Sequence, residues 1–279
     1  MAQDDPTQLP QVLQLHFLKA WDSPLPQPQV IHSHATSVQV LLSTAFEIPI
    51  TAQLLQLLPS LKLLIAPSAG LNHVDLAACR ARGVRMANSP SIFAADVADM
   101  AVGLFLDVMG KISAANRFVR DGFWVSRGDF VLDRREASIV GLGCIGLEVA
   151  KRLEAFDCKI LYNSRKESDV LVICCVLTAQ TRHMINKKIL LALGREGVIV
   201  NVGHGAIIDE KEMVQCLVQG EIRGAGLDVF GNEPEVRKKL FGLDNVVLSP
   251  HKAALTADCF TNLTDLAMAN LEAFFSNKP

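Results

Sequence analysis

The segment ASIVGLGCIGLEVAKRLEAFDCKILYNSR, residues 137–165, carries more structural information than any other part of the chain. Its pattern predicts an apolar strand at 138–141, a glycine-rich turn, a helix at 145–156 and a second apolar strand at 159–162. This order of strand, turn, helix and strand is the context that a dinucleotide-binding fingerprint requires.

The turn has the spacing Gly141-x-Gly143-x-x-Gly146, with Cys144 and Ile145 before the last glycine. The first glycine permits a tight turn, the second lets the backbone approach a pyrophosphate, and the third lets helix and strand pack closely. Unpaired amides and the dipole at the helix N-terminus then favour phosphate groups. The turn therefore predicts a nucleotide site, and an ordinary glycine-rich turn is the alternative.

The second strand is followed by Asn163, Ser164 and Arg165, at a point where NAD-binding folds usually place an acidic residue against the ribose. A hydroxyl and a guanidinium suit a 2′-phosphate instead. We therefore expect NADP in preference to NAD, and a solvated loop cation at Arg165 is the alternative.

The composition bounds the class of protein. The chain has 279 residues, half of them hydrophobic, and a formal net charge of −2, which suits one large or two medium domains. This charge gives no indication of binding to nucleic acid or to an anionic membrane, and no apolar run reaches the length of a membrane span. The polar, acidic N-terminal sequence resembles neither a signal peptide nor a transit peptide, so we expect a cytoplasmic protein.

The seven cysteines lie in apolar segments without metal-ligand spacing, so we expect reduced core residues and no metal site. Trp21 and Trp124 are also expected to be packing residues.

Strand-like and helical stretches alternate along the chain, which indicates an α/β fold with parallel sheets. A long apolar helix runs from Ser91 to about Gly122, and we expect it to cross between domains or to pack on a partner chain. Further helices are expected at 52–58, 186–193, 210–218 and 257–275, and further strands at 11–17, 39–43, 61–66, 84–87, 169–176, 197–202, 225–229 and 245–248.

Polar residues follow four of these strands, at the end where an open α/β sheet binds ligands. They lie in the segments 67–75, 201–205, 228–234 and 249–252. The small residues of the first segment could offer free amides to a carboxylate.

Nearly the whole chain resembles the D-isomer-specific 2-hydroxyacid dehydrogenases, and most closely the plant-type NADPH-dependent glyoxylate/hydroxypyruvate reductases. The resemblance is carried, in order, by PSAGLNHVDL, ANSPSIFAADVADMAVGLFL, IVGLGCIGLEVAKRLEAF, SDVLVICCVLTAQTRHMIN, GVIVNVGHGAIIDE, GAGLDVFGNEPE, LFGLDNVVLSPH and NLEAFFSNKP. It implies two flavodoxin- or Rossmann-like domains and a homodimer. The implied substrate domain is 1–102 completed by 257–279, and the implied dinucleotide-binding domain is 103–256.

The resemblance also implies a role for each site residue. His251 protonates the carbonyl oxygen as hydride arrives from the nicotinamide, and Glu233 hydrogen-bonds His251 and favours its charged form. The amides of Ser68, Ala69 and Gly70 hold the substrate carboxylate. The implied cofactor residues are Gly141, Gly143, Cys144, Ile145, Gly146, Ser164, Arg165, Lys166, Val202, Gly203 and Asp228, the last of them beside the nicotinamide carboxamide.

The residues themselves leave other interpretations open. His251 also fits a loop histidine, and Glu233 before Pro234 fits plain turn chemistry. Asp228 could be satisfied by nearby backbone amides.

The chain departs from the family at His204, where the family carries an arginine that binds the substrate's carboxylate and carbonyl. Histidine has a shorter reach and presents one useful donor at a time, so it cannot reproduce a bidentate clamp. We still count His204 among the catalytic residues, with reduced turnover.

The second departure follows Arg165. The family continues with a third strand and a helix, on the order of twenty residues, where this chain has only Lys166, Glu167 and Ser168. In the strand order 3-2-1-4-5-6, strands 2 and 4 flank strand 1, about 9.6 Å apart, and a return along a strand of roughly 17 Å widens the gap to about 20 Å. The connection spans that gap only when fully extended. We therefore expect a sheet that lacks one strand and helix, in which strand 2 shortens, strand 4 starts late, or one of them leaves the sheet.

Taken together, the sequence predicts an NADP-dependent reductase of glyoxylate or hydroxypyruvate with impaired activity. The alternative is a non-catalytic paralogue or truncated product that keeps dimerisation and at most weak nucleotide binding.

Overall fold

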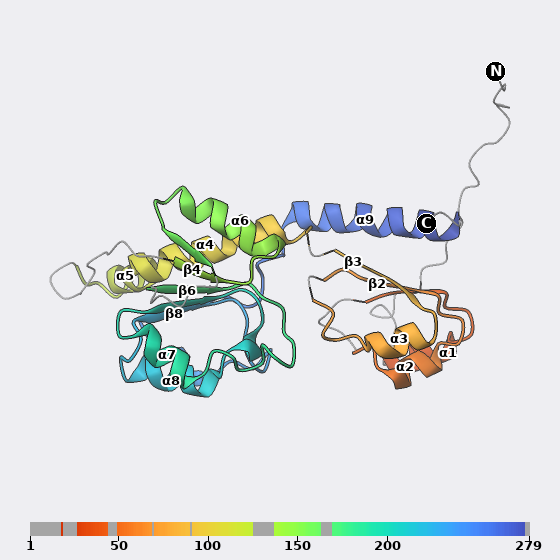
Figure 1. Ribbon diagram of the computed structural model, residues 1–279, viewed down its shortest axis with the longest axis horizontal. Coiled ribbons are helices and arrows are strands. Elements are labelled where there is room, and N and C mark those ends of the chain that lie inside the picture. The colour runs from red at the N-terminus through yellow and green to blue at the C-terminus, as the bar shows by residue number, and fades with distance from the viewer. Residues whose placement is uncertain are drawn as a thin grey trace, which may run out of the picture. The chain divides into compact units, whose positions relative to one another are not determined.

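The computed structural model describes residue 18 and residues 27–43, 49–68, 70–89, 91–124, 137–162 and 169–276. The chain divides into two units, one formed by Met1–Asn88 with Asn262–Pro279 and the other by Ser89–Thr261. Each unit contains one parallel sheet with helices on both faces (Figure 1). The expected α/β fold with parallel sheets is confirmed, while the strand expected at 11–17 lies outside the described residues.

The first unit is built on a three-stranded sheet of order β1-β2-β3. Its strands are β1 (Val40–Leu42), β2 (Leu63–Ala66) and β3 (Arg85–Asn88), and its helices are α1 (Gln27–Ser33), α2 (Ala52–Leu57), α3 (Leu76–Ala81) and the last part of α9 (Ala257–Phe275).

The central strand β2 is apolar throughout because both of its faces are covered. Side chains alternate along a strand, so Leu64 packs with Leu55 of α2 and Cys79 of α3, whereas Leu63 and Ile65 pack with Leu271 of α9. The helices therefore cover the two faces of this sheet from opposite sides (Figure 1).

The second unit is built on a six-stranded sheet of order β5-β4-β6-β7-β8-β9. In chain order the strands are β4 (Ala137–Val140), β5 (Ile160–Tyr162), β6 (Val170–Ile173), β7 (Val198–Asn201), β8 (Gly224–Leu227) and β9 (Val246–Leu248). Helices α4 (Ala94–Gly110) and α6 (Cys144–Glu154) lie on one face, and α7 (Lys187–Leu193) and α8 (Glu210–Val218) on the other (Figure 1). The central strands are buried along their whole length, as expected for a doubly covered sheet.

Strand β5 comprises Ile160–Tyr162, and residues 163–168, which connect it to β6, lie outside the described residues. Both strands flank β4 as expected, and β6 does not start late, because Ala137 pairs with both Ile160 and Val170. Tyr162 pairs with Ile139, so the return along the sheet is only two residues, about 7 Å, instead of a full strand. With two strand spacings the gap is about 12 Å, well within reach of eight peptide steps. Among the described strands, β5 is therefore one edge of the sheet, and β9 is the other.

The expected long helix is divided into α4 and α5 (Ile112–Arg120) at Lys111, whose φ of 50° lies in the left-handed region. It was expected to cross between domains or to bind a partner chain, but the buried face of α4 packs on α6 and on β7, β8 and β9 of its own unit. Glycines in β8 permit this contact: a Cβ on Gly226 would lie 2.9 Å from the Leu104 Cβ.

This packing also places the boundary between the units before α4, at Asn88–Ser89, and not at 102–103 within the helix. The second boundary lies at Thr261–Asn262, inside α9, and not at its start.

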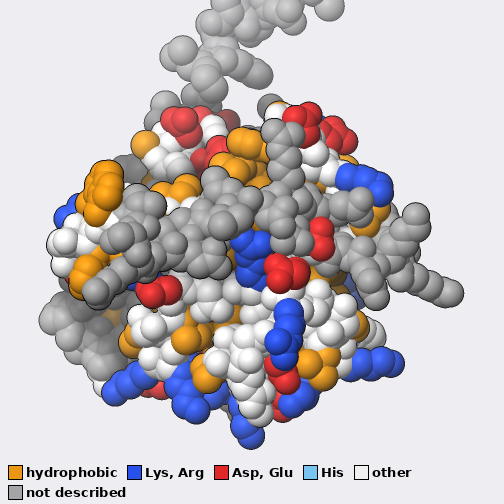
Figure 2. Space-filling view, turned by 90° about the vertical axis from the view of Figure 1, so that its left-hand side faces the viewer, with side chains coloured by type: hydrophobic (Ala, Val, Ile, Leu, Met, Phe, Trp, Pro, Cys, Tyr) orange, Lys and Arg blue, Asp and Glu red, His pale blue; other side chains and the backbone are white. Residues whose placement is uncertain are grey.

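Helix α5 differs from α4 in that none of its residues is buried. Ile112 and Val119 are exposed, and so are Phe123 and Trp124 just after the helix. Trp124 is 72% exposed, so it is not the packing residue that we expected. Figure 2 shows this end of the unit, where hydrophobic side chains reach the surface and Lys and Arg side chains gather along the lower rim.

All seven cysteines are free thiols. Cys79, Cys174, Cys216 and Cys259 are buried, but Cys144 is exposed, because it is the first residue of α6, directly after the glycine turn. Among the described residues, no cluster of histidines, cysteines and acids could hold a metal ion, and no helix is long and apolar enough to cross a membrane.

Candidate active site

The carboxyl ends of β7, β8 and β9 bring together three of the polar segments that the sequence singled out. His204 follows β7, Asp228 follows β8 directly, and His251 lies three residues beyond β9. Neighbouring parallel strands end at the same edge of a sheet, where α/β folds bind their ligands.

Asp228 is buried and holds the loop that carries His251. Its Oδ1 accepts hydrogen bonds from the Ser249 hydroxyl at 2.5 Å and the Lys252 N–H at 3.0 Å, and its Oδ2 accepts from the Ala253 N–H at 3.1 Å. The interpretation that nearby amides satisfy this acid is therefore correct. Asp228 fixes the loop, and its role beside a nicotinamide stays a prediction.

Glu233 and His251 form the central pair of the site. The Glu233 Oε2 lies 2.6 Å from the His251 Nδ1, and the Glu233 Oε1 accepts the Phe230 N–H at 2.8 Å. His251 adopts a φ of 51°, in the left-handed region. It lies in a tight turn closed by a hydrogen bond from the His251 N–H to the Ser249 carbonyl, and this backbone conformation sets the direction of its ring.

The electrostatics of this pair favour a proton on His251. Burial alone lowers the pKa of His251, but the hydrogen bond to Glu233 and the charges of Glu233 and Asp228 outweigh burial and raise that pKa above the usual value. Burial likewise raises the pKa of Glu233, while His251 and the Phe230 N–H lower it more strongly. Both shifts therefore favour a carboxylate on Glu233 and a protonated ring on His251, with the Nδ1 proton directed at Glu233.

His204 is held as a hydrogen-bond acceptor at Nδ1. Its Nδ1 accepts the Ala206 N–H at 3.3 Å, while its carbonyl accepts the Asn201 Nδ2 at 3.1 Å. Burial lowers the pKa of His204, Glu233 opposes this, and the positive charges of His251 and Arg182 lower the pKa further.

The glycine turn fits a dinucleotide's pyrophosphate. A Cβ on Gly146 would lie 2.0 Å from the Gly141 carbonyl oxygen, and a Cβ on Gly141 would lie 2.8 Å from the backbone of Cys175. Beside Gly143, by contrast, there is open space within 4 Å. Gly143 caps α6 without a side-chain hydrogen bond, which leaves room for a phosphate at the helix N-terminus.

The other predicted cofactor residues are divided. Cys144 and Ile145 begin α6, and Val202 and Gly203 follow β7, where a Cβ on Gly203 would lie 2.8 Å from the Cys175 carbonyl oxygen. Ser164, Arg165 and Lys166 lie outside the described residues.

The predicted substrate segment belongs to the first unit. The Ser68 hydroxyl donates to the Gly70 carbonyl at 2.7 Å, and the Ser68 N–H donates to the Ala66 carbonyl at 2.7 Å. The Ser68 amide is therefore engaged locally and is not offered to a ligand, contrary to our expectation. Ala69 lies outside the described residues.

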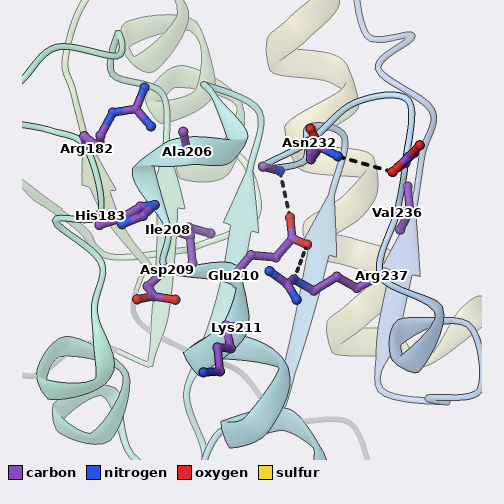
Figure 3. A pocket seen from close by; sticks show the side chains of 12 residues that line it. Arg182, His183, Ala206, Ile208, Asp209, Glu210, Lys211, Asn232, Val236 and Arg237 are labelled. Atoms are coloured by element: carbon purple, nitrogen blue, oxygen red, sulfur yellow. Dashed lines mark hydrogen bonds and ion pairs between the residues drawn. The ribbon is translucent and has the colours of Figure 1, made fainter.

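A cavity of about 410 Å³ lies beside the site, and sequence reasoning missed it. Ala206, which bonds His204, is part of its wall together with Arg182, and the His183 N–H donates to the Ala206 carbonyl at 2.9 Å. Figure 3 shows the Glu210 carboxylate in this wall, bound to the Gly231 N–H at 2.7 Å and to the Arg237 Nε at 2.9 Å. His204, Glu233 and His251 do not line this cavity, so the reactive groups lie outside it.

Comparison with known proteins identifies the family. The model of the "D-isomer specific 2-hydroxyacid dehydrogenase, NAD binding domain" matches residues 102–168 and 164–253. The chain belongs to the D-isomer-specific 2-hydroxyacid dehydrogenases. The resemblance seen in the sequence is thereby confirmed, and the NAD-binding domain of this dehydrogenase lies within the second unit.

Several relatives of the dehydrogenase are close. A glyoxylate/hydroxypyruvate reductase of Arabidopsis thaliana is 48% identical over 274 residues, covering 90% of this chain and 84% of the relative. A hydroxyphenylpyruvate reductase of Plectranthus scutellarioides is 45% identical over 250 residues, covering 82% and 80%. Among solved structures, an NADPH-dependent glyoxylate/hydroxypyruvate reductase of Sinorhizobium meliloti in complex with NADP and malonate has a TM-score of 0.79 and 34% identity, covering 88% of this chain and 82% of its own.

Proposed function

We propose that the dehydrogenase reduces small 2-oxo acids, such as glyoxylate and hydroxypyruvate, with NADP as cofactor and with turnover limited by His204. The observation that carries this proposal is the 2.6 Å contact between Glu233 and His251 at the carboxyl edge of the sheet. The reductase activities named for the relatives from Arabidopsis thaliana and Sinorhizobium meliloti support it.

The residues of the chain divide the work of such a reduction. A bound reduced nicotinamide supplies the hydride. The carbonyl carbon accepts that hydride while the carbonyl oxygen takes the proton from the His251 Nε2. Glu233 keeps His251 charged and oriented, and Asp228 holds the loop on which His251 lies.

We assign NADP binding to the second unit and substrate binding by the Gly70 amide to the first. Support for the nucleotide site comes from the open space beside Gly143 and the close contacts of Gly141 and Gly146. Support for the phosphate form comes from Ser164 and Arg165 in the sequence and from the NADP bound in the Sinorhizobium relative.

This assignment of the cofactor is tested by titrating the protein with NADPH and NADH, followed by nicotinamide fluorescence. NADPH should bind more tightly, and Arg165→Ala should narrow the difference, because a guanidinium pairs well with a 2′-phosphate. Equal affinities for the two cofactors in the unmutated protein would exclude the assignment.

We also propose that a strand and a helix of the family are missing after Arg165. The two matches to the family model meet at residues 164–168, which is the point of the proposed deletion. The Arabidopsis relative aligns over 274 positions that include 90% of this chain, about 251 residues, so about 23 positions have no counterpart here.

We further propose a homodimer formed through α5. The support is a helix without a buried residue and the exposed apolar side chains of Ile112, Val119, Phe123 and Trp124. A monomeric soluble protein rarely leaves such a group of side chains together at its surface.

The deciding experiment for the whole proposal is turnover. Oxidation of NADPH on addition of glyoxylate or hydroxypyruvate, lost in His251→Ala, is the expected result. NADPH binding without oxidation would instead favour the non-catalytic paralogue.

A further inference from the structure

The hydrogen bond that the His204 Nδ1 accepts indicates the tautomer of the ring. An imidazole nitrogen that accepts a hydrogen bond carries no proton, so the Nδ1 that accepts the Ala206 N–H is unprotonated. The ring proton is then on Nε2, and the ring is neutral. Burial and the neighbouring positive charges lower the pKa of His204, which agrees with the neutral form.

The charges around the two histidines do not select an anion. Among the described residues of this unit, His251 is positive, Glu233 is negative beside it, and the buried Asp228 is negative behind both. The side chains of Arg182 and Lys252 are positive but exposed, and solvent screens charges at such positions. The buried groups among these described residues of the second unit therefore carry no net positive charge.

We infer that the site reduces uncharged hydroxyaldehydes and hydroxyketones as well as 2-oxo acids, with the Nε2–H of His204 as a neutral donor to the group next to the carbonyl. This inference rests on the proposed function and names its substrate class. A hydroxymethyl group can exchange a hydrogen bond from water for one from a neutral donor with little change in free energy. A carboxylate is stabilised most by charge-assisted hydrogen bonds, and a neutral donor does not supply one to compensate the desolvation of the carboxylate.

The reaction is otherwise unchanged. The carbonyl carbon gains a hydride from the reduced nicotinamide, the carbonyl oxygen gains the His251 proton, and the oxidised cofactor and an alcohol leave. Only the group beside the carbonyl differs, so acid and uncharged substrates can be compared in pairs of nearly equal size.

The experiment measures kcat/KM with NADPH for hydroxypyruvate against 1,3-dihydroxyacetone, and for glyoxylate against glycolaldehyde. In the unmutated protein the acid should be favoured by about ten-fold or less in each pair. His204→Arg should raise that preference by a further ten-fold or more, because a charge-assisted bond is roughly twice as strong as a neutral one. His204→Gln, which keeps a neutral donor, should leave the preference within about three-fold of the unmutated value.

Two controls separate a local effect from a general one. Gln219→Arg adds the same charge at the exposed C-cap of α8 and should leave both preferences unchanged. Nitrogen NMR of the protein without substrate should show the His204 Nδ1 unprotonated at neutral pH. A doubly protonated ring there would overturn the inference without reference to turnover.

The outcomes of the assay distinguish the inference from the proposed function. Turnover of both acids with none of either uncharged partner overturns the inference and leaves the function standing. Turnover of neither class overturns both. Turnover of both classes with a preference that His204→Arg does not change overturns the role of position 204.

Discussion

At the scale of single residues, the site depends on two histidines held in opposite states. His251 faces a carboxylate through Nδ1, whereas His204 faces a backbone N–H through the same ring atom. The first contact favours a charged ring and the second a neutral one. Two identical side chains can thus serve as a proton donor and as an uncharged hydrogen-bond donor.

Reductase activity should fall as the pH rises through the raised pKa of His251, because only the protonated ring can donate. Glu233 raises that pKa. Glu233→Gln should therefore move the fall to lower pH, by roughly one pH unit. The pH profile of kcat/KM measures this, with Glu235→Gln as the control, since the Glu235 carboxylate accepts a hydrogen bond from the Asn232 side chain at 3.4 Å and not from His251 among the described residues. A profile that Glu233→Gln leaves in place would show that His251 is not the acid.

His73 should make the first unit less stable at acid pH. Both of its ring nitrogens are buried without a hydrogen-bond partner among the described residues, and burial lowers its pKa. The unfolded chain takes up a proton near pH 6.5 and the folded chain only at lower pH. The stability is therefore fully present above about pH 6.5 and is lost as the pH falls toward the folded pKa.

Thermal melts at pH 7.5 and 5.5 measure this loss. His73→Gln should reduce the difference between the two melting temperatures, whereas His34→Gln, at an exposed position of the same unit, should not. An equal pH effect in both variants would assign the loss to other groups.

At the scale of elements, two substitutions in the glycine turn between β4 and α6 should affect folding and nucleotide binding separately. Gly146→Ala forces a methyl group against the Gly141 carbonyl, 2.0 Å away, and should lower the free energy of unfolding by about 3 kcal/mol. Gly143→Ala meets nothing within 4 Å and should leave stability nearly unchanged while it weakens NADPH binding. Denaturant melts and NADPH titrations of both variants measure the two effects. Normal NADPH affinity in a folded Gly143→Ala protein would show that the pyrophosphate does not bind beside Gly143.

Elements with a strong local signal could be predicted from the sequence, and the others could not. β4, α6 and β5 follow from apolar runs around spaced glycines, and α9 ends where its apolar pattern ends. The six-residue α3 was missed because it is too short to show a helical period and because no proline marks its end, as Pro59 does for the equally short α2. The break at Lys111 was missed because a left-handed lysine leaves no mark in the hydrophobic pattern.

The same limit applies to the candidate site. His251 and Glu233 could be named from their motifs, but the 2.6 Å contact depends on loops eighteen residues apart in sequence. Arg182 was missed because its relation to His204 arises only when the loops after β6 and β7 lie together. Asn201 lies in the predicted segment 201–205, but its hydrogen bond to the His204 carbonyl was not predicted. The register of β5 and β6 against β4 could not be predicted either, because pairing between strands is not stated by the sequence.

At the scale of the whole molecule, a charged substitution at Val119 should convert the proposed dimer into a monomer. It is 52% exposed on α5, and Val119→Asp would place a charge in the proposed interface, where its desolvation is unfavourable. Sedimentation should show a shift from dimer to monomer. Val218→Asp is the matched control, because Val218 is 58% exposed on a different helix, and that variant should sediment like the parent. A parent protein that is monomeric at all concentrations would exclude the interface.

The position of β5 at the end of the strand order has a consequence for how such a chain can evolve. Among the described strands, β5 pairs with β4 alone. Strands and helices on the outer side of β5 can therefore be gained or lost without a change in the connections of any other strand. The strand order from β4 to β9 positions His204, Asp228 and His251. This order is not changed by gains or losses of elements at the β5 edge. The same property makes the connection after β5 a suitable place to insert a reporter domain, since Tyr162 and Val170 on either side of it pair with residues of β4 that are only two positions apart.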